Sequence, residues 1–182
     1  MPDASFEQLE KECQKHSLTK IRIPHVLIDN HARQRSHRLA AVLMSCPELQ
    51  TLDVKGTHIQ FDGWRPIGEA LAYCPKLQVL DVEQCRIANT PDNCENFALW
   101  LQVRAASLTK VNLGRNFLFR AEQQGTLHFI TDALALCTRL EHVVLSNNDL
   151  QEQAAKILAP ALNNCPHPVS YTHLTLPTIY SV

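Results

Sequence analysis

The chain has 182 residues, of which 45% are hydrophobic and 19% charged, and its formal net charge at pH 7 is -1. This composition predicts one globular domain and excludes a disordered chain, because the apolar residues suffice to form a core. The balanced charge gives no global field that favours nucleic acid or an anionic membrane. No apolar run reaches the roughly 18 residues of a membrane span. We therefore expect no nucleic-acid partner and no membrane span.

The first segment, residues 1–17, is polar and predicts an N-terminal capping helix. Ser5 and Gln8 have the spacing of a capping box at its start. The segment lacks the apolar stretch of a signal peptide. The seven cysteines form no CxxC pair and are expected to be free thiols. The expected location is therefore the cytoplasm, with the nucleus possible.

Five blocks of the chain share the pattern L-x-x-L-x-L-x-x-N/C-x-L, with other aliphatic residues at some leucine positions. They begin at Leu18, Leu49, Leu77, Leu108 and Leu140, so successive starts are 28 to 32 residues apart. Each block predicts a short strand whose positions 1, 4, 6 and 11 face the core. An asparagine at position 9, such as Asn116, is expected to bond with loop backbone groups that the turn leaves unpaired.

Amphipathic helical segments alternate with these blocks. One of them predicts its own start, with Thr90 as the N-cap and Pro91 at the first helical position. Asp62 is the expected N-cap of the helix after the second block, and Pro160 is expected to kink the helix after the last block. Stacked units of a strand and a wider helix predict a curved solenoid.

The block lengths and the lead-ins Cys46-Pro47-Glu48-Leu49 and Cys74-Pro75-Lys76-Leu77 make residues 18–167 resemble leucine-rich repeat proteins. They resemble the long-repeat class typified by ribonuclease inhibitor. The resemblance implies an α/β solenoid of about five repeats, a curved horseshoe segment with a parallel β-sheet on the concave face and helices on the convex face.

The resemblance implies a non-catalytic intracellular scaffold or adaptor that binds another protein on its concave face. An alternative that it implies is a GTPase-activating accessory factor resembling the Ran GTPase-activating proteins, whose usual acidic C-terminal stretch is not visible in this chain. A ubiquitin-ligase substrate receptor would need an F-box-like module, and the residues before Leu18 are too few for one.

The phase of the repeats places a sixth block at Pro168, with Tyr171 and His173 where aliphatic residues are expected. Val169–Thr178 instead resembles a translated sequencing-library adapter. We therefore expect residues 169–182 to be a non-native tail and the natural chain to continue with further repeats. The alternative is a divergent strand that caps the solenoid.

No motif in the sequence predicts catalysis. Cys46, Cys74, Cys137 and Cys165 all lie three residues before a block start, which favours a shared packing role. There is no G-x-S-x-G nucleophile motif, no glycine-rich phosphate loop and no clustered zinc-ligand pattern. We expect no enzyme activity, no metal, no cofactor and no small-molecule substrate.

Block positions 3, 5, 7, 8 and 10 are expected to line the concave face. The candidate partner-binding residues are Lys20, Arg22, Asp53, Lys55, Asp81, Glu83, Arg86, Lys110, Asn112, Arg115, Phe117 and His142. Phe117 with Arg86 and Arg115 is the predicted hot spot, because aromatic and arginine side chains dominate such sites. Asp53 and Asp81 are interpreted as a solvated acidic patch rather than a catalytic pair. Such a mixed face suits a protein ligand bound by charge complementarity.

Overall fold

The computed structural model describes residues 2–13, 18–25, 32–57, 59, 63–118, 124–150, 152–163 and 170–172. The helices are α1 (Pro2–Cys13), α2 (Ala32–Met44), α3 (Trp64–Leu71), α4 (Pro91–Arg104), α5 (Gln124–Ala135) and α6 (Glu152–Asn163). The strands are β1 (Lys20–Arg22), β2 (Thr51–Asp53), β3 (Val79–Asp81), β4 (Lys110–Asn112), β5 (His142–Val144) and β6 (Ser170–Thr172). A short 3-10 helix, η2 (Ile87–Asn89), precedes α4. In the described part of the chain no helix is long and apolar enough to cross a bilayer.

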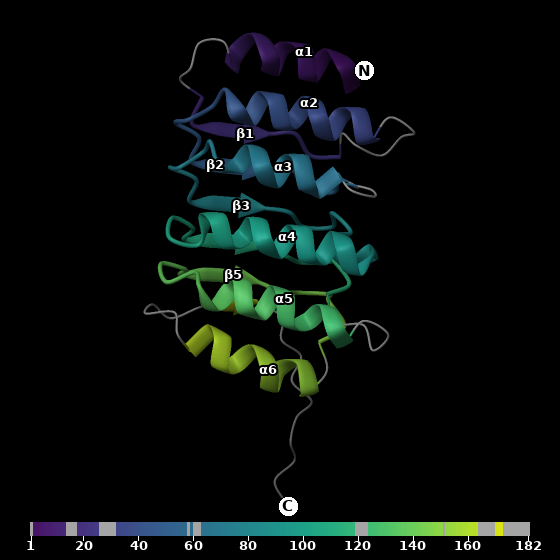
Figure 1. Cartoon of the computed structure of the whole chain (residues 1–182), viewed down its shortest axis with the longest axis vertical. Helices are drawn as coiled ribbons and strands as arrows, with labels where there is room; N and C mark the ends of the chain where they lie inside the picture. Colours follow the sequence, from purple (N-terminus) through teal and green to yellow (C-terminus); the bar gives the residue numbers. More distant parts are fainter. Residues whose placement is uncertain are drawn as a thin grey trace, which may run out of the picture.

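The strands form one parallel sheet in the order β1-β2-β3-β4-β5-β6. Each strand begins at block position 3, and the register pairs identical positions, as in Lys20 with Thr51 and Thr51 with Val79. The helices form a second layer, stacked in chain order along the long axis of the molecule (Figure 1). The predicted fold class, a solenoid with a parallel sheet on one face and helices on the other, is confirmed.

The core lies between the sheet and the helices. The middle residue of each of the first five strands, at block position 4, is buried: Ile21, Leu52, Leu80, Val111 and Val143. Each such side chain contributes roughly 1.5–3 kcal/mol on burial. Between α3 and α4 an aromatic cluster adds to the core, with ring centroids 5.1 Å apart for Trp64 and Phe97 and 5.0 Å apart for Phe97 and Trp100.

A ladder of buried polar side chains at block position 9 ties each loop to the repeat before it. Thr57 Oγ1 donates to the Ile23 carbonyl at 3.3 Å, and Cys85 Sγ lies 3.2 Å from the Val54 carbonyl. Asn116 Nδ2 donates to the Val82 carbonyl and Asn148 Nδ2 to the Leu113 carbonyl, both at 2.8 Å. All four acceptors occupy position 6 of the preceding block, so the structure confirms the predicted role of this slot and extends it to threonine and cysteine.

The predicted helix starts have different outcomes. Thr90 is the N-cap of α4, where its side chain accepts the Asn93 N–H at 3.2 Å, and Pro91 follows at the first helical position, as predicted. The capping box at Ser5 is wrong, because α1 already begins at Pro2 and includes Ser5. Proline suits a first helical position, where no N–H is needed. Asp62 lies outside the described residues, and α3 has Gly63 at its N-cap without a side-chain cap.

Part of the expected tail adds a strand to the sheet. β6 pairs with β5 in the register of the earlier repeats, with Tyr171 opposite Val143. The repeat phase therefore continues to residue 172, although the sequence predicted that it stops near His167. An open strand edge pairs readily with any extended segment, so this pairing does not depend on the origin of residues 169–182. The non-native origin of these residues stays a prediction.

Candidate protein-binding surface

The strands place the first candidate residues in two rows. The first row is block position 3, which is the first residue of each strand. It contains Lys20 on β1, Lys110 on β4 and His142 on β5, all of them exposed. Position 5 forms the second row, which contains Arg22, Asp53, Asp81 and Asn112. The structure therefore brings together the strand residues that the sequence predicted as a surface.

Three side chains of the position 5 row also close the turns after their strands. Asp53 Oδ1 accepts the Lys55 N–H at 3.2 Å, and Asp81 Oδ1 accepts the Glu83 N–H at 3.0 Å. Asn112 Oδ1 accepts the Gly114 N–H in the same way, at 3.1 Å. Aspartate and asparagine are favoured in such turns because their short side chains reach the backbone two residues on. This turn-closing role was not predicted from the sequence, although the repeated Asp or Asn at block position 5 indicates it.

Glu83 is the centre of a charged network across three successive repeats. Its Oε2 atom lies 2.6 Å from Lys55 Nζ, and its Oε1 atom lies 3.5 Å from Arg115 Nε. Asn112 Nδ2 donates to Glu83 Oε2 at 3.3 Å and to Asp81 Oδ2 at 3.2 Å. A separate ion pair joins Arg22 Nε to Asp53 Oδ2 at 2.9 Å.

The network and the burial of its members shift the pKa values of Glu83, Lys55 and Asp81. Burial favours the neutral form of Glu83, but its bonds with Lys55, Asn112 and Arg115 outweigh burial and hold the pKa of Glu83 below its usual value. The bond to Glu83 raises the pKa of Lys55. Burial raises the pKa of Asp81 despite the hydrogen bonds that it accepts from the Glu83 backbone and from Asn112.

In the ion pairs of this face the basic side chains extend into solvent, whereas the carboxylates of Asp53 and Glu83 are recessed. Arg22 is 62% exposed beside Asp53 at 16%, and Lys55 and Arg115 are 41% and 56% exposed beside Glu83 at 18%. The sequence predicted a face with basic, acidic and polar zones. Around Asp53 and Glu83 the outer layer of the face is basic, because these paired carboxylates lie closer to the sheet than the Arg22, Lys55 and Arg115 side chains.

The predicted hot spot lies beyond the strands. Arg115 follows β4 at position 8, and Arg86 and Phe117 lie at position 10, so none of them is on the sheet itself. All three have left-handed backbone conformations, with φ between 56° and 59°. Phe117 is half-buried, whereas Arg86 and Arg115 are exposed. Their joint action as a hot spot stays a prediction.

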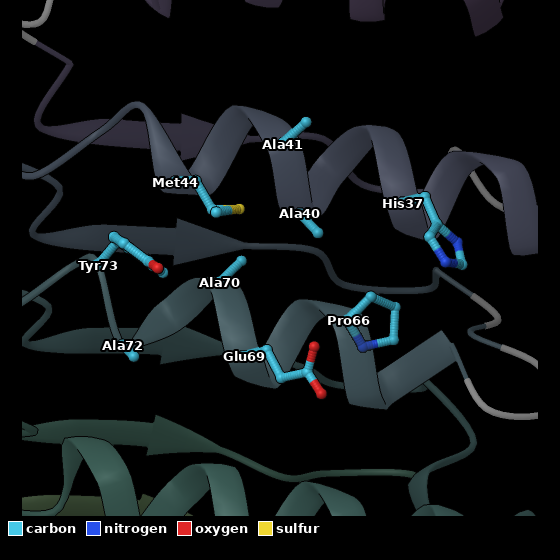
Figure 2. Close-up of a pocket in the computed structure, with 9 residues that line it drawn as sticks. All are labelled: His37, Ala40, Ala41, Met44, Pro66, Glu69, Ala70, Ala72 and Tyr73. Atoms are coloured by element: carbon cyan, nitrogen blue, oxygen red, sulfur yellow. The ribbon is translucent and has the colours of Figure 1, made fainter.

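A groove on the helix layer is a second candidate surface, and the sequence analysis did not find it. It lies between α2 and α3, has a volume of about 770 Å³, and is floored by small side chains such as Ala40 and Ala70. Figure 2 shows Met44 and Tyr73 at one end of this convex groove and His37 at the other. Met44 and Tyr73 are about half exposed. Large apolar residues just before the Cys-Pro lead-ins are the sequence feature that indicates it.

The described residues contain no group of three or more His, Cys, Asp or Glu side chains that could hold a metal ion. The six cysteines they include are all buried, and no disulfide joins them: Cys13, Cys46, Cys74, Cys85, Cys94 and Cys137. Cys165 lies outside the described residues. The packing role that the sequence predicted for this slot is consistent with the burial of Cys46, Cys74 and Cys137.

Solved structures with the same architecture include a leucine-rich repeat-containing protein, LegL7 from Legionella pneumophila. It matches with a TM-score of 0.59 and 15% identity, over 92% of this chain and 52% of LegL7. The fold is a leucine-rich repeat solenoid. No protein-family model and no curated protein sequence matches the chain.

Two further solved structures match this solenoid over most of both chains. The tropomodulin C-terminal domain from Caenorhabditis elegans has a TM-score of 0.62 and 15% identity, over 90% of this chain and 92% of that domain. Leiomodin-1 actin-binding site 2 has a TM-score of 0.65 and 12% identity, over 89% of this chain and 87% of that structure. At these identities the likeness shows the fold alone.

Proposed function

We propose that the chain is a non-catalytic protein-binding module that holds an acidic surface of a partner on its concave face. The observation that carries this proposal is the arrangement of Arg22, Lys55 and Arg115, whose exposed cationic groups stand over the recessed carboxylates of Asp53 and Glu83. Oppositely charged surfaces speed encounter and select orientation. The face therefore suits a folded acidic partner.

Actin is the first partner to test. The leiomodin-1 structure that this solenoid resembles is an actin-binding site, and its likeness covers 89% of this chain. We also propose a cytoplasmic or nuclear location, because an actin-type partner and cysteines that are not joined in disulfides both suit a reducing compartment.

Binding of the purified chain to monomeric actin is measured by biolayer interferometry. Arg115→Glu is expected to weaken binding about tenfold, since it reverses an exposed charge and adds repulsion. Raising the ionic strength from about 50 to about 200 mM is expected to slow association. Arg65→Glu is the matched control, because Arg65 is 70% exposed on α3 in the helix layer. Its affinity is expected to equal that of the parent.

Absence of actin binding would exclude that partner, and the wider proposal is then tested with a partner recovered by cross-linking in cells. A partner whose affinity falls with Met44→Asp in the convex groove, but not with Arg115→Glu, would overturn the choice of the concave face.

The non-catalytic part of the proposal has its own test. The alternative, a GTPase-activating factor resembling the Ran GTPase-activating proteins, requires faster GTP hydrolysis by a small GTPase in the presence of this chain. We expect the hydrolysis rate of Ran and related GTPases to stay unchanged, and stimulation would contradict the proposal.

A further inference from the structure

Two buried thiols lie against each other at the N-terminal end of the solenoid. Cys13 Sγ and Cys46 Sγ are 3.0 Å apart, and both side chains are almost fully buried. Cys13 is the last residue of α1, and Cys46 follows α2. Because the S–S bond of a disulfide is about 2.05 Å long, the two sulfur atoms need to approach by only about 1 Å to bond.

This pair differs from three other buried cysteines of the described residues, Cys74, Cys85 and Cys137. Cys74 Sγ lies 3.3 Å from the Leu43 carbonyl, Cys85 Sγ 3.2 Å from the Val54 carbonyl, and Cys137 Sγ 3.4 Å from the Ala133 carbonyl. Their partners are backbone oxygens, which cannot form a covalent bond with them. Cys46 occupies the same slot as Cys74 and Cys137 but faces a second thiol, so the shared packing role does not account for the contact.

The contact joins the helix that covers the end of the solenoid to the first repeat. α1 is also held by Arg38, whose Nε and Nη2 atoms donate to Glu10 at 3.0 and 3.2 Å, and by the buried Leu9. In the described part of the chain, α1 packs against α2 less extensively than the other neighbouring helices pack against each other, and weakly packed elements open locally before the rest. Opening of α1 would expose both thiols to a small oxidant.

We propose that Cys13 and Cys46 form a reversible disulfide, reached by local opening of α1, that locks α1 onto the first repeat. A small disulfide such as oxidised glutathione is the oxidant. One protein thiolate attacks it, forms a mixed disulfide and releases one small thiol. The second protein thiolate attacks the protein sulfur of the mixed disulfide and releases the second small thiol. The two thiol protons end on the released thiols, the two protein sulfurs are oxidised, and the small disulfide is reduced.

The closed state protects the reduced pair. Burial raises the pKa of Cys13 to about 12, and it also holds the pKa of Cys46 above its usual value. Because the thiolate is the attacking species, the buried pair reacts slowly while α1 is in place. Oxidation therefore reports on how often α1 opens.

The full chain is incubated with oxidised glutathione, alkylated, digested and analysed by mass spectrometry. We expect a cross-linked Cys13–Cys46 peptide and a rise in Tm of roughly 5–15 °C that dithiothreitol reverses. Cys13→Ala and Cys46→Ala are each expected to show neither effect. Cys94→Ala is the matched control, because Cys94 is also buried but lies in α4, and it should behave as the parent. Exhaustive oxidation without this cross-link, or with a different pairing, would overturn the proposal.

A second measurement tests the route. Arg38→Ala removes the bidentate contact to Glu10 and is expected to speed disulfide formation about fivefold, as α1 opens more often. Arg65→Ala, which breaks the exposed pair with Glu69 at 3.2 Å on α3, is expected to leave the rate unchanged. Equal rates in the parent and Arg38→Ala would exclude opening of α1 as the limiting step and overturn the proposed route.

Discussion

The buried Asn116 side chain satisfies several loop backbone groups at once. Its Oδ1 atom accepts the N–H groups of Cys85 at 2.9 Å and Ile87 at 3.3 Å, while Nδ2 lies within hydrogen-bond distance of three carbonyls. Only an amide side chain offers both an acceptor and two donors. Cys85, at the same block position, offers only a weak S–H donor and a weak sulfur acceptor.

This difference predicts that removing the Asn116 side chain lowers the free energy of unfolding more than removing the Cys85 side chain. Asn116→Ala is expected to lower the free energy of unfolding by about 2–4 kcal/mol, because it leaves buried backbone groups without partners. Cys85→Ala is expected to cost about 1 kcal/mol. Urea denaturation of the two variants and the parent measures both values, and equal costs would contradict the argument.

Glu83 predicts a pH dependence of stability. A carboxyl group whose pKa is lowered on folding stabilises the folded chain above its unfolded pKa of about 4.3, and that contribution is lost as the pH falls through the folded value. Glu83→Gln is therefore expected to be about 1 kcal/mol less stable than the parent at neutral pH, with Lys55 partly screened by solvent.

The difference in unfolding free energy between the parent and Glu83→Gln is expected to shrink as the pH falls from about 7 to about 3. Urea denaturation at several pH values measures it. Glu69→Gln on α3 is the control, since its side chain is 69% exposed and its pair with Arg65 contributes little. A difference that stays constant with pH would show that Glu83 acts through shape rather than charge.

At the scale of single elements, the start of α4 depends on one hydroxyl. Thr90→Ala removes the acceptor of the Asn93 N–H and is expected to cost about 1 kcal/mol of unfolding free energy. Thr90→Ser keeps the oxygen and is expected to stay within about 0.5 kcal/mol of the parent. Chemical denaturation separates the two, and an equal loss in both variants would assign the effect to the threonine methyl group.

The elements that repeat were predictable from the sequence, and those that depend on neighbours were not. Block positions 3 to 5 form every strand because the spacing of aliphatic residues fixes which side chains enter the core. The start of α1 was missed because Ser5 has the local pattern of a cap while Pro2 suits the first turn equally well. Local patterns therefore decide the type of an element better than its ends.

The candidate surface was likewise predictable in part: the positions of its residues along the sheet were predicted, but the exposure of their charges was not. The alignment of blocks placed Arg22 beside Asp53 on adjacent strands, as the structure has them. Which charge reaches solvent could not be predicted, because it depends on side-chain length and on bonds such as that of Glu83 to Lys55. The convex groove was missed because it requires two helices whose relative placement the sequence does not state.

At the scale of the whole molecule, local stability is expected to differ between the middle strands of the described sheet and β1. Each repeat contacts only its neighbours, so inner repeats are held on two sides. The Val82 N–H, bonded to the Asn112 carbonyl in the middle of the sheet, is expected to exchange at least about tenfold more slowly than the Ile23 N–H near the first strand. Native-state hydrogen exchange measures both, and equal protection would indicate one cooperative unit.

The strand spacing of the in-register sheet also sets the repeat distance that a partner segment bound across the strands has to match. Equivalent residues such as Asp53 and Asp81 recur at the spacing of neighbouring strands, about 4.8 Å. Side chains on one face of an extended peptide recur every 6.8 Å or so, whereas successive turns of an α-helix are about 5.4 Å apart. A helix laid perpendicular to the strands therefore drifts by about 0.6 Å per strand relative to these rows, whereas an extended peptide drifts by about 2 Å per strand.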